Sequence, residues 1–301
     1  MILEGDTSVI EAIKEKKQLI DEGKDHEHIK PLLIIDGGLM KGAYGTGAVL
    51  AIDELGFTQA LTSVVGISSG AIAASYLLSG NTVGGSVMYE EACSKEFRPR
   101  FDFKNVINVN FFERVLAGDT GKGLLFDKIF YHAVKLYIGV SEYTTGKPVL
   151  ISPKNAADLL RSVRASISIP GSVSLPSYIN GVRYVDGAAS RPHILEHITN
   201  SLDATHILII TNQDKGTKHI SWLEHLMNVT VFRYRMSASL RTATNWRREA
   251  RHAFVEKTLF SPLKPMLFIW GNNSISSRES NPVIVKGVVE KSKAWWLDLL
   301  K

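Results

Sequence analysis

The feature that most constrains the fold is a unit of buried strand, glycine turn and helix that occurs twice in succession. The apolar run 31–36 leads through glycines into helical spacing over 43–55, and the run 61–65 leads through glycines into a small-residue helix over 69–79. This order predicts parallel strands joined by right-handed crossover helices. We expect further strands at 148–152, 182–185, 205–211 and 266–270, and further helices at 7–29, 127–136, 156–164, 222–253 and 283–300.

Length and composition place the chain among globular proteins. It has 301 residues, of which 45% are hydrophobic, and its one cysteine, Cys93, excludes an intrachain disulfide. No apolar run approaches the roughly 20 residues of a membrane span, and no signal peptide is recognisable, so a soluble, cytoplasmic protein is expected. The expected organisation is a charged helical extension over 1–30, a main domain over 31–212 and a helical or edge region over 213–301 packed on that domain.

The sharpest local signal is Gly66-Ile67-Ser68-Ser69-Gly70, the pattern G-x-S-x-G between an expected strand and an expected helix. A serine at such a sharp turn has strained backbone geometry, and glycine at both flanking positions removes side chains that would collide with the turn. The helix that follows directs its positive dipole toward the serine and toward an oxyanion formed during acyl transfer. Ser68 is therefore the candidate nucleophile, and an ordinary glycine-rich turn is the alternative.

A second glycine turn, Asp36-Gly37-Gly38-Leu39-Met40-Lys41-Gly42, also lies between a strand and a helix. Consecutive glycines let several backbone N–H groups point at one anion, either a phosphate or a tetrahedral oxyanion. The spacing matches neither G-x-x-x-x-G-K-[ST] nor G-x-G-x-x-G, so a nucleotide loop fits poorly. Since a candidate nucleophile follows after the next strand, an oxyanion hole is the better interpretation.

The third signal is Tyr184-Val185-Asp186-Gly187-Ala188, in which an expected strand ends at an aspartate. The carboxyl ends of strands form the rim where α/β sheets bind ligands, so Asp186 can orient a histidine or accept the serine proton itself. An ordinary aspartate is a weak base, so the direct role requires a short, sheltered contact with Ser68. A plain Asp-Gly hairpin turn is the alternative.

Together, the segments Asp36–Gly42, Gly66–Gly70 and Asp186–Ala188 resemble the patatin-like phospholipase family. That family carries a D-G-G-G-x-R-G loop, a G-x-S-x-G elbow and a D-G-[GA] aspartate in this order. The stretches Arg164–Gly171 and Asn180–Asp186 are similar to the family's lead-in to its aspartate. The resemblance covers about residues 31–212, and more loosely the C-terminal part is similar to that of bacterial members.

The resemblance implies a three-layer α/β/α sandwich with a mostly parallel central sheet, and a Ser–Asp dyad that uses no histidine. Carried over to this sequence, Ser68 is the nucleophile and Asp186 is the general base. The other implied site residues are Gly37, Gly38 and Leu39 for the oxyanion hole, the motif glycines Gly42, Gly66, Gly70 and Gly187, and Lys41 in support. Leu39 stands where the family has a third glycine, which keeps the N–H donor but loses backbone freedom. Lys41 stands where the family has arginine, which keeps the charge but loses the planar guanidinium fork.

The implied activity is phospholipase A-type hydrolysis of ester-linked fatty acids through an acyl-enzyme, with no cofactor and no metal. The implied partner is a phospholipid or another lipid ester. An acyltransferase or a general esterase with the same nucleophile remains an alternative, as does a non-catalytic module that binds lipids or anions. An α/β-hydrolase triad is a further rival, and His193, close to Asp186 in the sequence, is the histidine to mutate.

Contact with a membrane surface has two candidate contributors. Residues 233–252 hold six arginines against one acid within a chain of net charge +5, and a basic stripe binds lipid head groups or forms a solvated helix face. The pair Trp295 and Trp296 can anchor a helix at a membrane or dock on its own domain. No nucleic-acid motif accompanies the stripe, so no nucleic-acid partner is expected.

Overall fold

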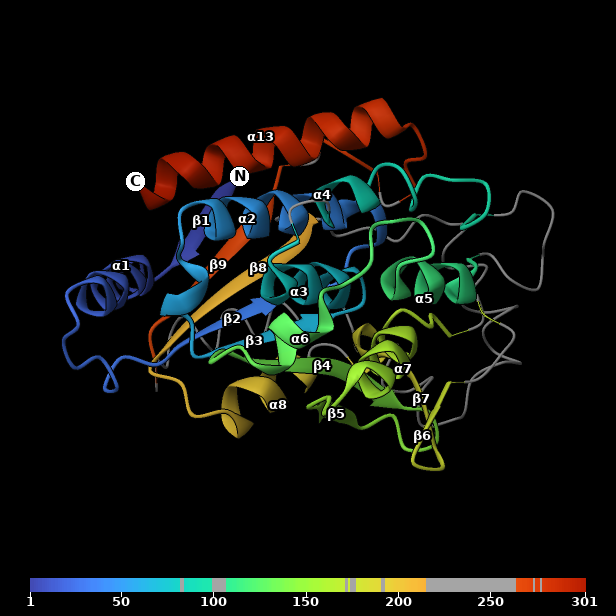
Figure 1. The fold of residues 1–301 in the computed structure, drawn as a ribbon, viewed down its shortest axis with the longest axis horizontal. Coiled ribbons are helices and arrows are strands. Elements are labelled where there is room, and N and C mark those ends of the chain that lie inside the picture. Colours follow the sequence, from blue (N-terminus) through green and yellow to red (C-terminus); the bar gives the residue numbers. More distant parts are fainter. Residues whose placement is uncertain are drawn as a thin grey trace.

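The computed structural model describes residues 1–81, 84–98, 107–170, 173, 177–190, 193–214, 264–272, 274–276 and 278–301. Its strands are β1 (Ile2–Gly5), β2 (Pro31–Ile35), β3 (Ser63–Ile67), β4 (Lys135–Glu142), β5 (Pro148–Ile151), β6 (Ser177–Ile179), β7 (Val182–Asp186), β8 (His206–Asp214) and β9 (Met266–Gly271). In the described part of the chain these form a nine-stranded sheet in the order β1-β9-β8-β2-β3-β4-β7-β6, with β5 paired to β4 (Figure 1).

The sheet is mixed. Strands β9, β8, β2, β3 and β4 are parallel neighbours at its centre, whereas β1, β5, β6 and β7 pair antiparallel. The parallel arrangement expected from the repeated strand, glycine turn and helix unit is therefore confirmed for the five central strands.

Helices cover both faces of the sheet and make the three layers (Figure 1). The helices are α1 (Ser8–Asp21), α2 (Gly42–Glu54), α3 (Ser69–Ser79), α4 (Gly84–Val87), α5 (Val109–Ala117), α6 (Phe126–Phe130), α7 (Ala156–Ser166), α8 (His193–Ser201) and α13 (Pro282–Leu300). Short 3-10 turns lie at Leu39–Lys41, Thr58–Ala60 and Gly187–Ser190.

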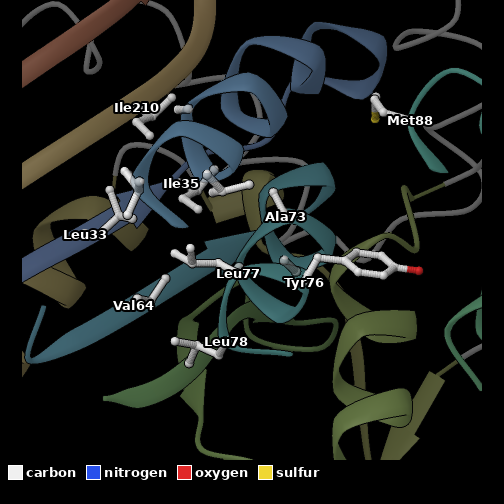
Figure 2. Packing of buried hydrophobic residues seen from close by; sticks show 14 of the residues in the cluster. Leu33, Ile35, Val64, Ala73, Tyr76, Leu77, Leu78, Met88 and Ile210 are labelled. Carbon is white, nitrogen blue, oxygen red and sulfur yellow. The ribbon is translucent and has the colours of Figure 1, made fainter. Parts of the chain in front are cut away.

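Alternate residues of β2 reach the two halves of the core. Leu33 and Ile35 join the cluster formed with α1, α2, α3, α7 and α13, whereas Leu32 and Ile34 join the cluster formed with α8. A strand buried on both faces must be apolar throughout, which accounts for the continuous run in the sequence. Figure 2 shows the first cluster, in which Leu33 and Ile35 lie with Leu77 of α3.

The prediction of a helix over 127–136 is wrong for most of that range. Helix α6 ends at Phe130, and the chain then forms β4, which lies between β3 and β7 in the sheet. A Cβ at Gly139 of β4 would lie 2.9 Å from side-chain atoms of both Ile67 and Ile194. The strand depends on partners that are distant in the sequence, and local apolar spacing contains no information about them.

The N-terminal segment contributes a strand as well as a helix. The sequence predicts only a helix over 7–29, whereas the structure has β1 at the sheet edge and a helix that already ends at Asp21. Strand β1 has only four residues, mostly exposed, so it lacks the buried apolar run typical of a central strand.

The C-terminal helix α13 packs across α2 (Figure 1). The approach is close at Gly47, where a Cβ would lie 2.5 Å from the backbone oxygen of Val289. Trp296 is completely buried in this contact region and stacks edge to face on Trp295. Of the two roles considered for the tryptophan pair, membrane anchor or docking on its own domain, docking is therefore correct for Trp296. The helix predicted over 222–253, with the arginine stripe, lies outside the described residues.

Candidate active site

The predicted nucleophile, Ser68, lies in the turn between β3 and α3. Its backbone has φ 55° and ψ −126°, a conformation that costs a residue with a side chain on the order of 1–3 kcal/mol. Crowding explains the two flanking glycines. A Cβ on Gly66 would lie 2.5 Å from Cα of Ala71, and a Cβ on Gly70 would lie 2.0 Å from the backbone oxygen of Ile35. The structure thus contains the sharp turn that the G-x-S-x-G pattern predicts.

Ser68 and Asp186 are in direct contact. The Ser68 hydroxyl donates a hydrogen bond of 2.8 Å to Oδ2 of Asp186, and Oδ1 of the same carboxylate accepts the backbone N–H of Ala188 at 2.8 Å. Both side chains are buried, with Ser68 5% and Asp186 4% exposed. The alternative of an Asp-Gly hairpin turn is wrong, because β7 is preceded by the hairpin at Asn180 and Gly187 begins a 3-10 turn.

The register of the sheet brings these two residues together. Ile67, the last residue of β3, lies opposite Gly139 of β4, and the next residue of β4, Val140, lies opposite Asp186. Asp186 lies level with the carboxyl end of the parallel strand β3, although its own strand β7 is antiparallel to β4. It reaches Ser68 because β7 ends beside the point where β3 ends.

Ser166, the last residue of α7, supports the strained turn. Its hydroxyl accepts the backbone N–H of Ser68 at 2.8 Å and donates to the backbone oxygen of Gly139 at 2.7 Å. Ser166 is completely buried. It lies in the stretch Arg164–Gly171, which resembles the family's lead-in to its aspartate, and no local pattern marks it as a support for the turn.

The glycine loop after β2 lies against the serine turn. A Cβ on Gly37 would be 2.6 Å from Cβ of Ser68, so only glycine allows this approach. The Gly37 N–H donates to Oδ1 of Asp36 at 2.7 Å, and the Gly38 N–H donates to the hydroxyl of Ser69 at 3.1 Å. Leu39 has φ 51°, a left-handed conformation that costs roughly 1–2 kcal/mol for a residue other than glycine.

The remaining predicted site residues occupy supporting positions. Lys41 ends the short 3-10 turn of the loop, and a Cβ on Gly42 would be 2.7 Å from Oγ of Ser69. A Cβ on Gly187 would be 2.5 Å from the backbone oxygen of Gly139. His193 lies on α8 with an exposed side chain and faces Glu196 across 3.8 Å.

Asn212, which no sequence argument singled out, contacts both ends of the glycine loop. Its side chain donates to the backbone oxygen of Asp36 at 2.6 Å and accepts the backbone N–H of Gly45 at 2.7 Å. The available signal is its place two residues after the apolar run 207–210, near the carboxyl end of an expected strand.

A mostly apolar pocket lies between α2, α3 and α4. Its lining includes Ser69, the neighbour of Ser68, together with Leu50, Ile72, Tyr76 and Met88. Burial raises the pKa of Tyr76 well above its ordinary value, so its phenol stays neutral. The volume of the pocket, about 20 Å³, is close to the space of a single water molecule, so the surrounding side chains nearly fill it.

Two negative findings concern the described residues alone. Within them, no cluster of three or more His, Cys, Asp or Glu side chains has the arrangement of a metal site. None of their helices combines the length and the hydropathy that crossing a bilayer requires.

Comparison with known proteins identifies one family. A family model described as patatin-like phospholipase matches residues 33–197, which is more than half of the chain. No protein in a search of curated sequences matches.

The chain also aligns with solved structures of longer proteins. VipD from Legionella pneumophila is 14% identical with a TM-score of 0.41, over 89% of this chain and 67% of that one. The type III effector protein ExoU is 12% identical with a TM-score of 0.34, over 90% of this chain and 53% of that one. The heterodimeric complex ExoU-SpcU from the type III secretion system of Pseudomonas aeruginosa aligns at 20% identity with a TM-score of 0.32, over 87% of this chain and 59% of that one. The chain thus spans between about half and two thirds of these proteins.

Proposed function

The chain belongs to the patatin-like phospholipase family, a family of lipid ester hydrolases, and on this premise we propose that it is a serine lipid acyl hydrolase of the phospholipase A type. Its substrate is a phospholipid or another lipid ester, and its catalytic pair is Ser68 and Asp186. The observation that carries the proposal is the hydrogen bond of 2.8 Å from the serine hydroxyl directly to the buried carboxylate.

In the proposed reaction Ser68 Oγ attacks the ester carbonyl while Asp186 accepts its proton. The tetrahedral intermediate collapses, the bond to the alcohol oxygen breaks, and Asp186 returns the proton to that oxygen. Water then attacks the acyl-enzyme, again losing its proton to Asp186, and the fatty acid leaves as Ser68 regains its hydrogen. No histidine is needed, because the carboxylate itself touches the nucleophile rather than reaching it through an imidazole.

The negative oxygen of the intermediate is assigned to the amides of Gly37, Gly38 and Leu39. The position of Gly37 against Ser68 supports this assignment. Two of these amides donate to the side chains of Asp36 and Ser69 in the structure. In the proposed mechanism they exchange these acceptors for the oxyanion, and an oxyanion-hole donor contributes a factor on the order of 100 to 1,000 in rate.

The pocket beside Ser69 is assigned to the fatty-acid chain. Its lining is mostly aliphatic and aromatic but also includes Asp53, and with a volume of about 20 Å³ the helices around it must separate before a hydrocarbon chain enters. The head group and glycerol backbone then remain outside, at a membrane surface that the protein contacts peripherally.

The test is turnover of a mixed lipid extract with products identified by mass spectrometry. We expect fatty-acid release by the wild type, and loss of nearly all turnover in Ser68→Ala and in Asp186→Asn with unchanged circular dichroism. His193→Ala is the matched control and should keep wild-type turnover. Wild-type activity in either dyad variant contradicts the proposal, and loss of activity in His193→Ala favours a triad.

Two alternatives predict different results in the same assay. An acyltransferase releases acyl product only when an acceptor alcohol is added. A lipid- or anion-binding module gives no product, and its Ser68 does not react stoichiometrically with a fluorophosphonate probe.

A further inference from the structure

The amide side chain of Asn212 links two points of the backbone that are nine residues apart, Asp36 and Gly45. Asn212 is 1% exposed. Its hydrogen bonds of 2.6 Å to Asp36 and 2.7 Å to Gly45 are both short. Between these two points lies the whole glycine loop, residues 37–42, together with the first turn of α2. One carboxamide therefore holds the loop at both of its ends.

The partners fix the orientation of this amide. A backbone carbonyl only accepts, so the atom that faces Asp36 O must be the NH₂ group, and a backbone N–H only donates, so the atom that faces Gly45 must be the oxygen. No other side chain of this size carries a donor and an acceptor in one plane at this spacing except aspartate in its protonated form. An asparagine is required if both bonds are to form at neutral pH.

Strand β8 places Asn212 at this point. Strands β8 and β2 are parallel neighbours (Figure 1). Ile210 lies opposite Ile35, and the Asp36 N–H donates to the backbone oxygen of Ile210 at 2.9 Å. Asn212 thus lies two residues beyond the last pair between β8 and β2. Its φ of 47° lies in an irregular stretch of β8 between Ile210 and Asp214, where the register with β9 shifts, and asparagine tolerates this conformation better than most residues.

The backbone around the loop leaves no space for movement toward Asn212. A Cβ on Gly38 would be 2.6 Å from the backbone oxygen of Asn212, and a Cβ on Gly45 would be 2.9 Å from its Nδ2. The loop is therefore in close contact with the backbone of Asn212 as well as tied to its side chain. Any displacement of the loop that keeps both hydrogen bonds must be small.

We propose that Asn212 is a positioning residue that holds the oxyanion loop at the distance from Ser68 that the reaction requires. The proposal rests on the proposed function for its catalytic consequence. Asn212 does not touch the reacting atoms. It acts by keeping the amides of Gly37, Gly38 and Leu39 in register with the ester carbonyl, and a misplacement of about 1 Å in such a site costs on the order of a hundredfold in rate.

Two variants separate the two hydrogen bonds. Asn212→Gly removes both bonds, and glycine suits the backbone at φ 47°. Asn212→Asp keeps the shape and the acceptor for Gly45 but places an oxygen against the backbone oxygen of Asp36. The matched control is Thr211→Val on the same strand, because Thr211 is also buried and its hydroxyl donates to the backbone oxygen of Ile269, away from the loop.

The first measurement is amide hydrogen exchange on the full chain, which needs no turnover. We expect faster exchange of the amides in 36–45 in Asn212→Gly, with the Gly45 amide still protected in Asn212→Asp and exchange in β2 and β3 unchanged in both. Thr211→Val should leave 36–45 as in the wild type. Unchanged exchange of 36–45 in Asn212→Gly overturns the proposal.

The second measurement is steady-state hydrolysis of a long-chain ester. We expect kcat to fall about 10- to 100-fold in both Asn212 variants with KM changed less than threefold, while Thr211→Val keeps its kcat. Faster exchange with an unchanged kcat overturns the catalytic role. A wild type that hydrolyses no ester refutes the proposed function instead, and the exchange experiment then still decides whether Asn212 holds the loop.

Discussion

The support of the strained turn by Ser166 can be tested by one substitution, Ser166→Ala. The change deletes a single oxygen and leaves almost no cavity, so its effect reports the two hydrogen bonds of that hydroxyl. The buried N–H of Ser68 loses its acceptor at 2.8 Å, which costs about 1–3 kcal/mol, and the bond to Gly139 adds about 1 kcal/mol. We therefore expect the free energy of unfolding to fall by about 2–4 kcal/mol, a large share of the roughly 5–15 kcal/mol that a folded protein has.

The same helix provides the control. Ser162 is also completely buried on α7, but its hydroxyl bonds within the helix, to the backbone oxygen of Asp158 at 2.6 Å. Because Ser162 lies inside the helix, alanine there gains helix propensity that partly offsets the lost bond, so Ser162→Ala should cost less than about 1 kcal/mol. Urea unfolding followed by circular dichroism measures both variants. If the two variants lose the same free energy of unfolding to within about 0.5 kcal/mol, the hydroxyl of Ser166 does not support the turn and the reasoning is refuted.

Two further predictions concern glycine positions and pH, and urea unfolding measures each of them. Gly287→Ala should stabilise the protein by about 0.5–1 kcal/mol, since the added Cβ meets nothing within 4 Å in α13. Gly70→Ala should destabilise the protein by about 3 kcal/mol or more, because the added Cβ would lie 2.0 Å from a backbone oxygen. Equal effects of the two substitutions would contradict the crowding argument. Burial lowers the pKa of His206 below its ordinary value of 6.5, so on acidification the unfolded state takes up the proton before the folded state does. The contribution of His206 to the free energy of unfolding is therefore fully present above about pH 6.5 and should decrease as the pH falls below that value. His206→Gln should flatten this decline, and a variant with the wild-type pH profile would refute it.

Much of the central fold could be predicted from the sequence because its signals are local. Helix α3 begins and ends where expected, at Ser69 and Ser79, and the left-handed Gly80 ends it. The strand predicted at 61–65 lies two residues later, at Ser63–Ile67. Glycine turns mark the ends of these elements whatever the rest of the chain does, so a single sequence suffices to find them.

Strand β4 and the supports of the site could not be predicted in this way. Ser166 bonds to a residue 98 positions away, and Asn212 bonds to residues 167 and 176 positions away. Serine and asparagine are common in loops and at helix ends, so their type carries no signal without the pairing of the sheet. The glycine and aspartate motifs identified the residues that meet at the candidate site, and the contacts that hold them in place became visible only in three dimensions.

The edge strand β1 also has a consequence for handling the protein. It covers the outer side of β9, with Leu3 opposite Ile269, and β9 is an apolar strand buried for most of its length. Deleting the first seven residues would bare the N–H and C=O groups of β9 and turn an interior strand into a template for pairing with other molecules. A shortened version that begins at α1 should therefore precipitate or self-associate at concentrations where the longer chain stays monodisperse.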